Sequence, residues 1–192
     1  IRHGKTNSNI EHRFSGWEEA TLSKEGIEEL LLFKETLAYP KTDLYYSSDL
    51  KRAIDTFNYL FGDEQTLYRI EPGFRETHFG EIDGKTSQEA QGIHMRDEFL
   101  KNKSPFGAET VMDFSSRIYM SLSRIYEELT LLDLKSATIV AHSGTLKMLR
   151  IILENRPFSD YFSLNMDNGR GYWVEIERDD FHRFKLLNIG DI

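Results

Sequence analysis

Two histidines of this chain stand where a strand is expected to end. His142 follows the apolar run 137–141 and precedes Gly144, while His3 lies in the opening Ile-Arg-His-Gly of residues 1–4. We expect a first strand to precede His3, most of it upstream of residue 1. Backbone N–H groups at the start of a following helix favour an anion, so an imidazole there would lie beside negative charge. A single such histidine is more often a loop or core residue, but two at equivalent positions favour a shared site.

Two arginines accompany these histidines. Arg2 is adjacent to His3, and Arg52 falls in the first turn of a helix expected after a strand at residues 43–47. A guanidinium matches phosphate oxygens with paired hydrogen bonds. The helix dipole slightly disfavours a cation in the first turn, so the position of Arg52 hints at function, although a surface arginine is the plain alternative.

The spacing of apolar residues predicts the elements that position these side chains. We expect helices over Ser23–Leu37, Asp49–Phe61, Thr110–Leu129 and Thr145–Leu153, strands over Asp43–Ser47, Leu67–Ile70 and Ala137–Ala141, and a closing hairpin from Tyr172–Ile176 and His182–Leu187. This alternation predicts an α/β fold, a three-layer sandwich whose mostly parallel central sheet is flanked by helices. Ligands of such sheets lie beyond the carboxyl ends of the strands, where both histidines are expected.

The length of 192 residues predicts a single domain over residues 1–192. Between residues 71 and 105 the periodicity fades and glycines recur, so we expect an irregular or helical insertion that forms a lid over the site. Residues 14–17 and this insertion are expected to select the substrate. Trp17, Phe79 and Phe106 are candidate apolar contacts, with local core packing as an equally reasonable role.

Composition excludes several classes of function. The chain has no cysteine, which excludes disulfides, thiolate metal sites and thiol catalysis and favours a cytoplasmic protein. Its net charge of −8 argues against a nucleic-acid binder, and no apolar run is long enough to span a membrane. The remaining histidines show no metal-ligand spacing, so we expect neither a metal nor another cofactor; they are His12, His78, His94 and His182.

Six segments, in order along nearly the whole chain, together resemble one family. Residues 2–9 (RHGKTNSN) resemble the R-H-G-x-T-x-x-N signature of the histidine phosphatase superfamily, which is phosphoglycerate-mutase-like. The other segments are residues 13–17 (RFSGW), 47–53 (SSDLKRA), 74–81 (FRETHFGE), 107–110 (GAET) and 141–144 (AHSG). The resemblance is to the phosphatase branch, which includes broad-specificity and α-ribazole phosphatases.

The resemblance implies phosphoryl transfer through a phosphohistidine. His3 would be the nucleophile, and Glu76 would protonate the leaving oxygen and then activate water, with Glu81 as the alternative carboxylate. The phosphoryl oxygens would be bound by Arg2, Arg52 and His142, with a neutral hydrogen bond from Asn9. The other residues expected to bind substrate are Ser15, Gly16 and Ser143.

Two departures from the family pattern concern residues beside the site. Lys5 stands where Glu or Gln is common, and Ser143 stands where Gly is common. The partner implied is a small phosphorylated metabolite, bound by a monomer or homodimer. Two alternatives stay open at this point: a cofactor-dependent phosphoglycerate mutase, and a non-catalytic phosphate-binding module.

Overall fold

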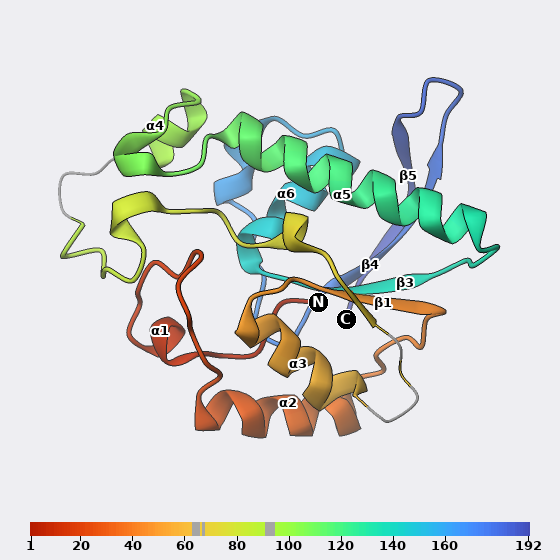
Figure 1. The fold of residues 1–192 in the computed structure, drawn as a ribbon, viewed down its shortest axis with the longest axis horizontal. Helices are drawn as coiled ribbons and strands as arrows, with labels where there is room; N and C mark the ends of the chain where they lie inside the picture. The colour runs from red at the N-terminus through yellow and green to blue at the C-terminus, as the bar shows by residue number, and fades with distance from the viewer. Residues whose placement is uncertain (63–65, 67, 91–94) are drawn as a thin grey trace.

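The computed structural model describes residues 1–62, 66, 68–90 and 95–192, and it has three layers (Figure 1). The middle layer is a parallel sheet with strand order β2-β1-β3, formed by β1 (Leu44–Ser47), β2 (Tyr68–Ile70) and β3 (Ala137–Val140). One face is covered by α2 (Lys24–Thr36) and α3 (Lys51–Phe61), the other by α5 (Val111–Leu131) and α6 (Ser143–Leu153). The predicted α/β class with a parallel sheet flanked by helices is therefore confirmed; Leu67, the first residue of one predicted strand, lies outside the described residues.

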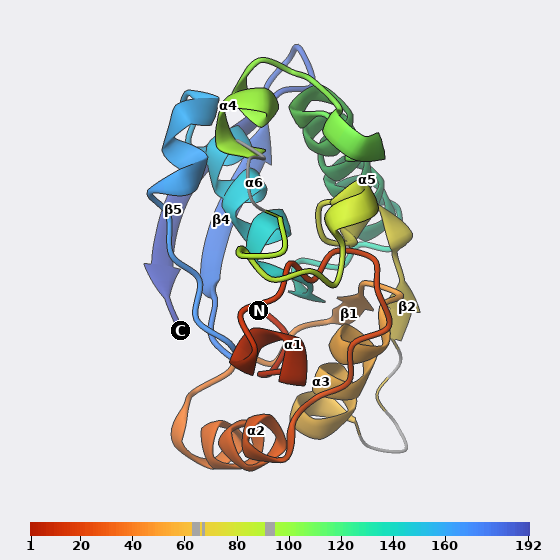
Figure 2. The same cartoon turned by 90° about the vertical axis from the view of Figure 1, so that its left-hand side faces the viewer.

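The N-terminal residues extend this sheet beside β3. The Ile1 amino group donates to the Ile139 carbonyl at 2.8 Å, and the His3 N–H donates to the Ala141 carbonyl at 2.9 Å. On the other side lies the antiparallel hairpin of β4 (Tyr172–Arg178) and β5 (Phe184–Asp191), so the N-terminus sits between the two sheets (Figure 2). The predicted hairpin is confirmed, and both of its strands run further than predicted.

Capping explains where the helices begin. Ser23 and Thr110 accept hydrogen bonds from the backbone of the first turns of α2 and α5, as is usual for N-cap residues. The helix predicted to begin at Asp49 begins at Lys51 as α3, so Asp49 does not cap it; the helix follows Leu50 without a side-chain cap. Asp49 instead binds the Arg75 guanidinium at 2.8 Å, and a charged donor is the stronger partner for a carboxylate.

The segment predicted as a lid contains short helical turns: η1 (Pro72–Phe74), η2 (Gly80–Ile82), α4 (Met95–Leu100) and the first residue of η3 (Pro105–Gly107). Two of its aromatic side chains, Phe74 and Phe99, are buried in the main apolar core. Residues 91–94 lie outside the described residues. Single-turn helices elsewhere, α1 (Asn7–Ile10) and η4 (Phe158–Phe162), were likewise not predicted, because such short pieces show no periodicity.

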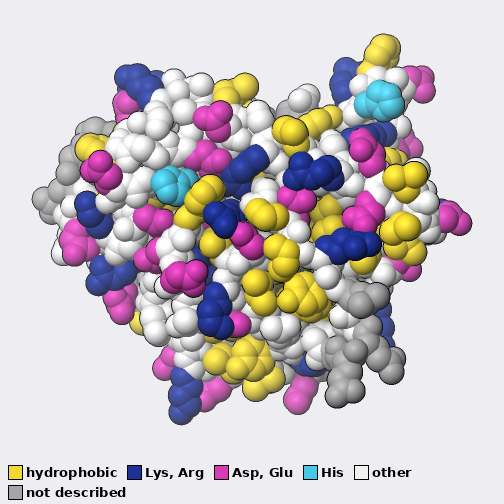
Figure 3. Space-filling model, viewed as in Figure 1, with side chains coloured by type: hydrophobic (Ala, Val, Ile, Leu, Met, Phe, Trp, Pro, Cys, Tyr) yellow, Lys and Arg dark blue, Asp and Glu magenta, His cyan; other side chains and the backbone are white. Residues whose placement is uncertain are grey.

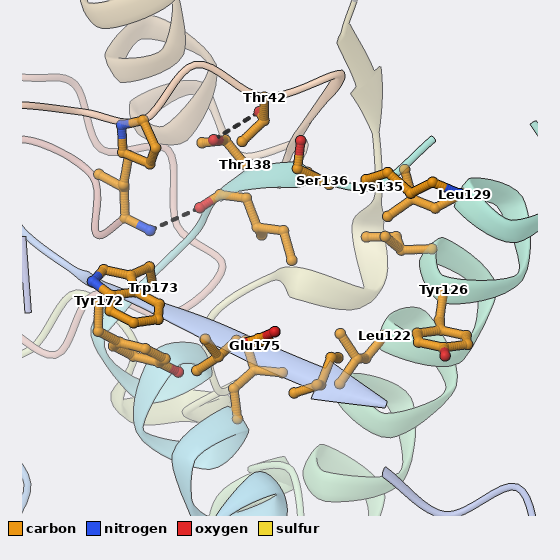
Figure 4. Close-up of a pocket in the computed structure, with 18 of the residues that line it drawn as sticks. Thr42, Leu122, Tyr126, Leu129, Lys135, Ser136, Thr138, Tyr172, Trp173 and Glu175 are labelled. Atoms are coloured by element: carbon orange, nitrogen blue, oxygen red, sulfur yellow. Dashed lines mark hydrogen bonds between the residues drawn. The ribbon is translucent and has the colours of Figure 1, made fainter. Parts of the chain in front are cut away.

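A large apolar cavity of about 1070 Å³ separates β3 from β4 (Figure 4). Its walls include Leu122 and Leu129 of α5, Tyr172 and Trp173 of β4, and Thr138 of β3. None of the five residues predicted to be catalytic lines this cavity. This cavity is thus separate from the predicted site.

The described helices include none long and apolar enough to cross a membrane. On the face shown in Figure 3, basic and acidic side chains are intermixed, and no wide patch of one sign appears.

Candidate active site

His3 and His142 converge at the carboxyl ends of two neighbouring extended segments. Their ring centroids are 5.2 Å apart, and both side chains are buried. His3 emerges from the N-terminal segment, whereas His142 is the N-cap of α6 directly after β3. Parallel pairing brings them together because the two segments end at the same edge of the sheet.

The tautomer of His3 follows from its neighbour. His3 Nδ1 lies 2.7 Å from the Gly4 carbonyl oxygen, which can only accept, so the ring proton resides on Nδ1 and Nε2 keeps its lone pair. Burial, followed by the charges of Arg52 and Arg2, holds the pKa of His3 well below its ordinary value. The ring is therefore a neutral imidazole at neutral pH, and the lone pair of Nε2 is available.

His142 is also held as a neutral imidazole. Arg52 Nε donates to His142 Nδ1 at 3.3 Å, which leaves the ring proton on Nε2, 2.8 Å from the Ser48 hydroxyl. Burial and then the Arg52 charge keep the pKa of His142 well below its ordinary value. Ser48 was not predicted as a site residue; its place at the end of a predicted strand was the available signal.

Arg52 is fully buried and ties the loop at residues 15–18 to the histidines. Its Nη2 donates to the carbonyls of Gly16 at 2.5 Å and Ser15 at 3.3 Å, and its Nη1 donates to that of Glu18 at 3.1 Å. Together with the bond to His142, these contacts use Nε and both Nη atoms. The guanidinium thus fixes the wall of the site and places its charge beside both imidazoles.

Two hydrogen-bonding atoms in this region are buried without a partner among the described residues. They are Arg2 Nε and Ser15 Oγ. Arg2 is otherwise held by the Met166 carbonyl, to which Nη1 donates at 2.5 Å. An unsatisfied buried donor costs roughly 1–3 kcal/mol, so a bound oxyanion that accepts from these atoms would be favoured.

The loop that carries Gly16 is braced by Asp83, a residue that the sequence did not single out. The Asp83 carboxylate accepts from the backbone N–H groups of Gly16 at 2.6 Å, Trp17 at 2.7 Å and Glu18 at 3.1 Å. Gly16 was predicted to bind substrate, but its N–H donates to this carboxylate. The Asp83-Gly84 turn was a weak signal, because such pairs mark turns generally.

Asn9 braces the segment after His3. Its Oδ1 accepts from the Thr6 N–H at 3.2 Å in a capping box and from Asn168 Nδ2 at 3.2 Å. Asn168 Nδ2 also lies 2.9 Å from the His3 carbonyl. Ser143, the other predicted contact, is the first residue of α6 and is partly exposed.

Glu76 lies at the N-terminus of α6. Its Oε2 accepts from the Gly144 N–H at 2.9 Å, and its Oε1 accepts from the Thr77 N–H at 2.8 Å. A methyl group on Gly144 would stand 2.1 Å from Glu76 Oε1, so the approach requires glycine. The group that occupies this helix terminus, two residues along from His142, is thus the carboxyl group of Glu76, whereas Glu81 is exposed.

A partly buried ion pair fixes the backbone around Glu76. Arg117 donates to the carbonyls of Gly73, Arg75 and Glu76 at 2.7–2.8 Å and forms a two-pronged pair with Glu109 at 2.6 and 2.8 Å. Glu109 belongs to a segment that carried the family resemblance, but the role of Arg117 was not predicted. The pair orients the main chain from which the Glu76 side chain projects.

Comparison with known proteins identifies the family. The sequence model of the histidine phosphatase superfamily (branch 1) matches residues 1–189. This chain belongs to the histidine phosphatase superfamily. The resemblance inferred from the six sequence segments is therefore confirmed.

Three relatives show the range of this similarity. A glucosyl-3-phosphoglycerate phosphatase of Mycolicibacterium vanbaalenii is 30% identical, over 92% of this chain and 81% of its own. The crystal structure of the α-ribazole phosphatase from Shigella flexneri matches with a TM-score of 0.79 and 25% identity, over 97% of this chain and 92% of its own. A 2,3-bisphosphoglycerate-dependent phosphoglycerate mutase of Borreliella afzelii is 25% identical, over 100% of this chain and 90% of its own.

The aromatic residues proposed to contact substrate in this histidine phosphatase lie in different environments. Trp17 is 38% exposed, donates to the Glu76 carbonyl at 2.8 Å and has the Arg75 guanidinium over its ring. Phe79 packs against Phe14 with ring centroids 5.4 Å apart, and Phe106 is half exposed. Trp17 thus contacts the backbone of Glu76, a residue predicted to be catalytic.

No group of three or more His, Asp or Glu residues that could hold a metal occurs within residues 1–62, 66, 68–90 and 95–192. His94, one of the histidines considered for ligand spacing, lies outside these ranges. A metal-independent reaction stays a prediction for this histidine phosphatase.

Proposed function

We propose that the protein hydrolyses phosphomonoesters of small metabolites through a phosphohistidine at His3. The observation that carries this proposal is the neutral, buried His3, whose unprotonated Nε2 stands among fixed cations. Arg2 Nε and Ser15 Oγ, two buried atoms without hydrogen-bond partners in the described part of the chain, support the binding of an oxyanion, since Arg2 precedes His3 and the Ser15 carbonyl accepts from Arg52.

The first step is transfer of the phosphoryl group to the enzyme. His3 Nε2 attacks phosphorus, the bond between phosphorus and the ester oxygen breaks, and that oxygen takes a proton from Glu76. Arg2 and Arg52 offset the negative charge on the phosphoryl oxygens. Such chemistry depends mainly on positioning and electrostatics, which a preformed set of charges provides.

The second step releases phosphate. Glu76, now ionised, accepts a proton from a water molecule as that water attacks phosphorus, and the bond between phosphorus and His3 Nε2 breaks. The proton returns Glu76 to its acid form, and cleavage of the bond between phosphorus and Nε2 returns the imidazole to its neutral starting state. The N–H groups of Gly144 and Thr77 hold the carboxyl group of Glu76 in place beside His142, and this fixed position supports its proposed part in both proton transfers.

A phosphoglycerate mutase is the second candidate, since a relative bears that name. A mutase must protect its phosphohistidine from water and hold a bisphosphate primer. The segment 71–105 is polar around residues 83–87, and Lys101 and Lys103 are its only close pair of basic residues in the sequence. A polar segment is expected to admit water, and a single close pair of lysines is a poor site for a bisphosphate, so the segment favours hydrolysis over the mutase reaction.

The test is a panel of phosphorylated metabolites assayed for phosphate release, with and without EDTA. We expect release from several monoesters, insensitivity to the chelator and inhibition by vanadate. A parallel assay supplies 3-phosphoglycerate with and without 2,3-bisphosphoglycerate. Primer-dependent formation of 2-phosphoglycerate that outpaces phosphate release from every monoester would replace this proposal with the mutase. A cytoplasmic location and a monomer or homodimer stay predictions.

A further inference from the structure

The hydroxyl of Tyr161 lies beside the carboxyl group of Glu76. A methyl group added to Gly144 would stand 2.5 Å from Tyr161 Oη and 2.1 Å from Glu76 Oε1, so both oxygens approach the same side of this glycine. Tyr161 belongs to η4, whereas Glu76 follows η1, so segments distant in the chain supply the two groups. The phenol thus reaches the place where the proposed proton transfers occur.

Aromatic packing holds the Tyr161 ring in place. Its centroid lies 5.2, 5.1 and 6.4 Å from those of Phe99, Phe162 and Phe114. Phe99 of α4 and Phe114 of α5 are themselves buried. Because the ring is held from several sides, its hydroxyl is in position before a substrate arrives, as preorganised catalytic groups require.

The Tyr161 hydroxyl keeps its proton at neutral pH. Burial, followed by the charge of Glu76, raises the pKa of Tyr161 above its ordinary value, and the nearby Thr77 hydroxyl and the Arg117 charge lower it only in part. A protonated phenol can donate one hydrogen bond and accept another. Tyr161 therefore offers a neutral polar group next to a carboxyl group that exchanges protons.

The hydroxyl of Thr77 adds a third polar atom to this region. Thr77 Oγ1 is buried, with 3% of the residue exposed, and meets no partner with hydrogen-bond geometry in the part of the chain that is described. The Thr77 N–H donates to Glu76 Oε1 at 2.8 Å, so the residue is adjacent to the carboxyl group. A buried water molecule typically makes about three hydrogen bonds. Glu76, Tyr161 and Thr77 supply such a set of partners.

We propose that the Tyr161 hydroxyl, together with Glu76, positions the water molecule that attacks the phosphohistidine. This inference rests on the proposed phosphatase function. One hydrogen of the water points to the Glu76 carboxylate and the other to Tyr161 Oη, so a lone pair of the water oxygen points to phosphorus. As that oxygen bonds to phosphorus, the bond between phosphorus and His3 Nε2 breaks. The first hydrogen passes to Glu76 as a proton, and Tyr161 keeps its own proton.

This role distinguishes the two steps of the reaction. In the first step the oxygen at this position is the ester oxygen, which carries a carbon where the attacking water has its second hydrogen. Tyr161 Oη then has no hydrogen bond to accept, so transfer of the phosphoryl group to His3 depends on Glu76 and not on Tyr161. An alcohol that replaces water as the acceptor also lacks the second hydrogen. Loss of the Tyr161 hydroxyl should therefore slow attack by water more than attack by an alcohol.

The experiment compares the wild type with Tyr161→Phe, which keeps the packed ring. The kcat/KM for p-nitrophenyl phosphate reports phosphorylation of His3, and rapid-quench decay of the phosphohistidine reports attack by water. Glycerol is added as an alcohol acceptor, and the ratio of free phosphate to glycerol phosphate measures the competition. The matched control is Tyr172→Phe, because the Tyr172 hydroxyl donates to the Leu146 carbonyl at 2.8 Å and the residue lines the apolar cavity.

We expect Tyr161→Phe to slow the decay of the phosphohistidine by about 5- to 20-fold, the size of one lost hydrogen bond. The ratio of free phosphate to glycerol phosphate should fall by a similar factor. The kcat/KM for p-nitrophenyl phosphate should stay within about twofold of the wild-type value, since the first step does not use the hydroxyl. Tyr172→Phe should change none of the three quantities.

Unchanged decay of the phosphohistidine, or equal slowing of both steps with an unchanged product ratio, would overturn the inference. Where circular dichroism shows Tyr161→Phe to be misfolded, Thr77→Val tests the same water position, because it removes Oγ1 and keeps the N–H that holds Glu76. An unchanged product ratio in that variant would refute the water position. Absence of a phosphohistidine in the wild type would instead overturn the proposed function, and this inference with it.

Discussion

The site around His3 and the cavity between β3 and β4 both adjoin β3, but the first is formed by charged and polar groups and the second by mainly apolar ones. The site lies at the carboxyl end of β3, where charged and polar groups are packed against one another and are buried. The cavity lies along β3 toward its amino end, measures about 1070 Å³ and is lined largely by apolar side chains. Volume and apolar lining usually mark a ligand site. Here the convergence of cations and buried unpartnered donors marks it instead.

This difference indicates that the proposed reaction depends on charged groups held in fixed positions and does not depend on a large cavity. In the site, Arg52 and Asp83 each hold the loop at residues 15–18 through several hydrogen bonds. Such bonds keep the charges in place before the substrate arrives, so little reorganisation accompanies the reaction. The cavity offers no comparable set of fixed donors among its lining residues.

The largest effect is expected when the nucleophile is removed. His3→Ala should lower phosphate release by about 10⁴-fold or more, the scale seen when a covalent nucleophile is lost. Rates are measured with p-nitrophenyl phosphate, and the phosphorylated residue is mapped by mass spectrometry at alkaline pH. His182→Ala, in the turn before β5, is the control and should be fully active. A phosphoryl group found on His142 or a serine, and not on His3, would refute the assignment.

A large but substrate-dependent effect is expected at the proton donor. Glu76→Gln should slow turnover by about 10²- to 10⁴-fold for esters of poorly acidic alcohols, because proton transfer to the leaving oxygen is lost. The loss in phosphorylating His3 should be smaller with p-nitrophenyl phosphate, whose leaving group needs less protonation. Glu81→Gln is the matched control. Equal losses with both substrates, or a stronger effect of Glu81→Gln, would move the role away from Glu76.

A smaller effect is expected from pH. The lowered pKa of His3 keeps its ring neutral as the pH falls through the range in which an ordinary histidine is protonated. Between pH 7 and pH 6 an ordinary histidine would lose about threefold in its neutral fraction, whereas the rate of His3 phosphorylation should not show this loss. Rapid-quench measurement of phosphohistidine formation tests the profile. A decline centred near the ordinary histidine value would show that the site does not lower the pKa.

The smallest effect on activity is expected at the cavity. Ala137→Val adds two methyl groups on β3 at the cavity wall, so it should leave kcat/KM unchanged and stabilise the protein by about 1 kcal/mol. The matched substitution Ala53→Val, at a fully buried position next to Arg52, should destabilise by roughly 1–3 kcal/mol through overpacking. Thermal unfolding of both variants measures the contrast. A destabilised Ala137→Val would show that the cavity wall is as tightly packed as the region behind the site.

The sequence predicted the long elements well because each repeats its apolar spacing over several turns or residues. α2, α5, β1 and β3 begin and end within two residues of their predicted bounds. The start of α3 was predicted two residues too early, at Asp49. That side chain binds Arg75, a residue distant in the sequence, and local sequence does not reveal this contact. The short helices escaped prediction because one turn carries no periodic signal.

The sequence by itself determined the family, and it named the residues proposed to carry the phosphoryl chemistry, since motifs fix residue types at set distances along the chain. The bracing contacts of Asp83 and Arg117 and the tautomer of His142 were decided only by the tertiary structure. Each depends on contacts between segments far apart in the chain, such as Asp83 with Gly16 and His142 with Ser48. Charges and hydrogen bonds act through space, and sequence spacing alone does not specify which distant groups meet.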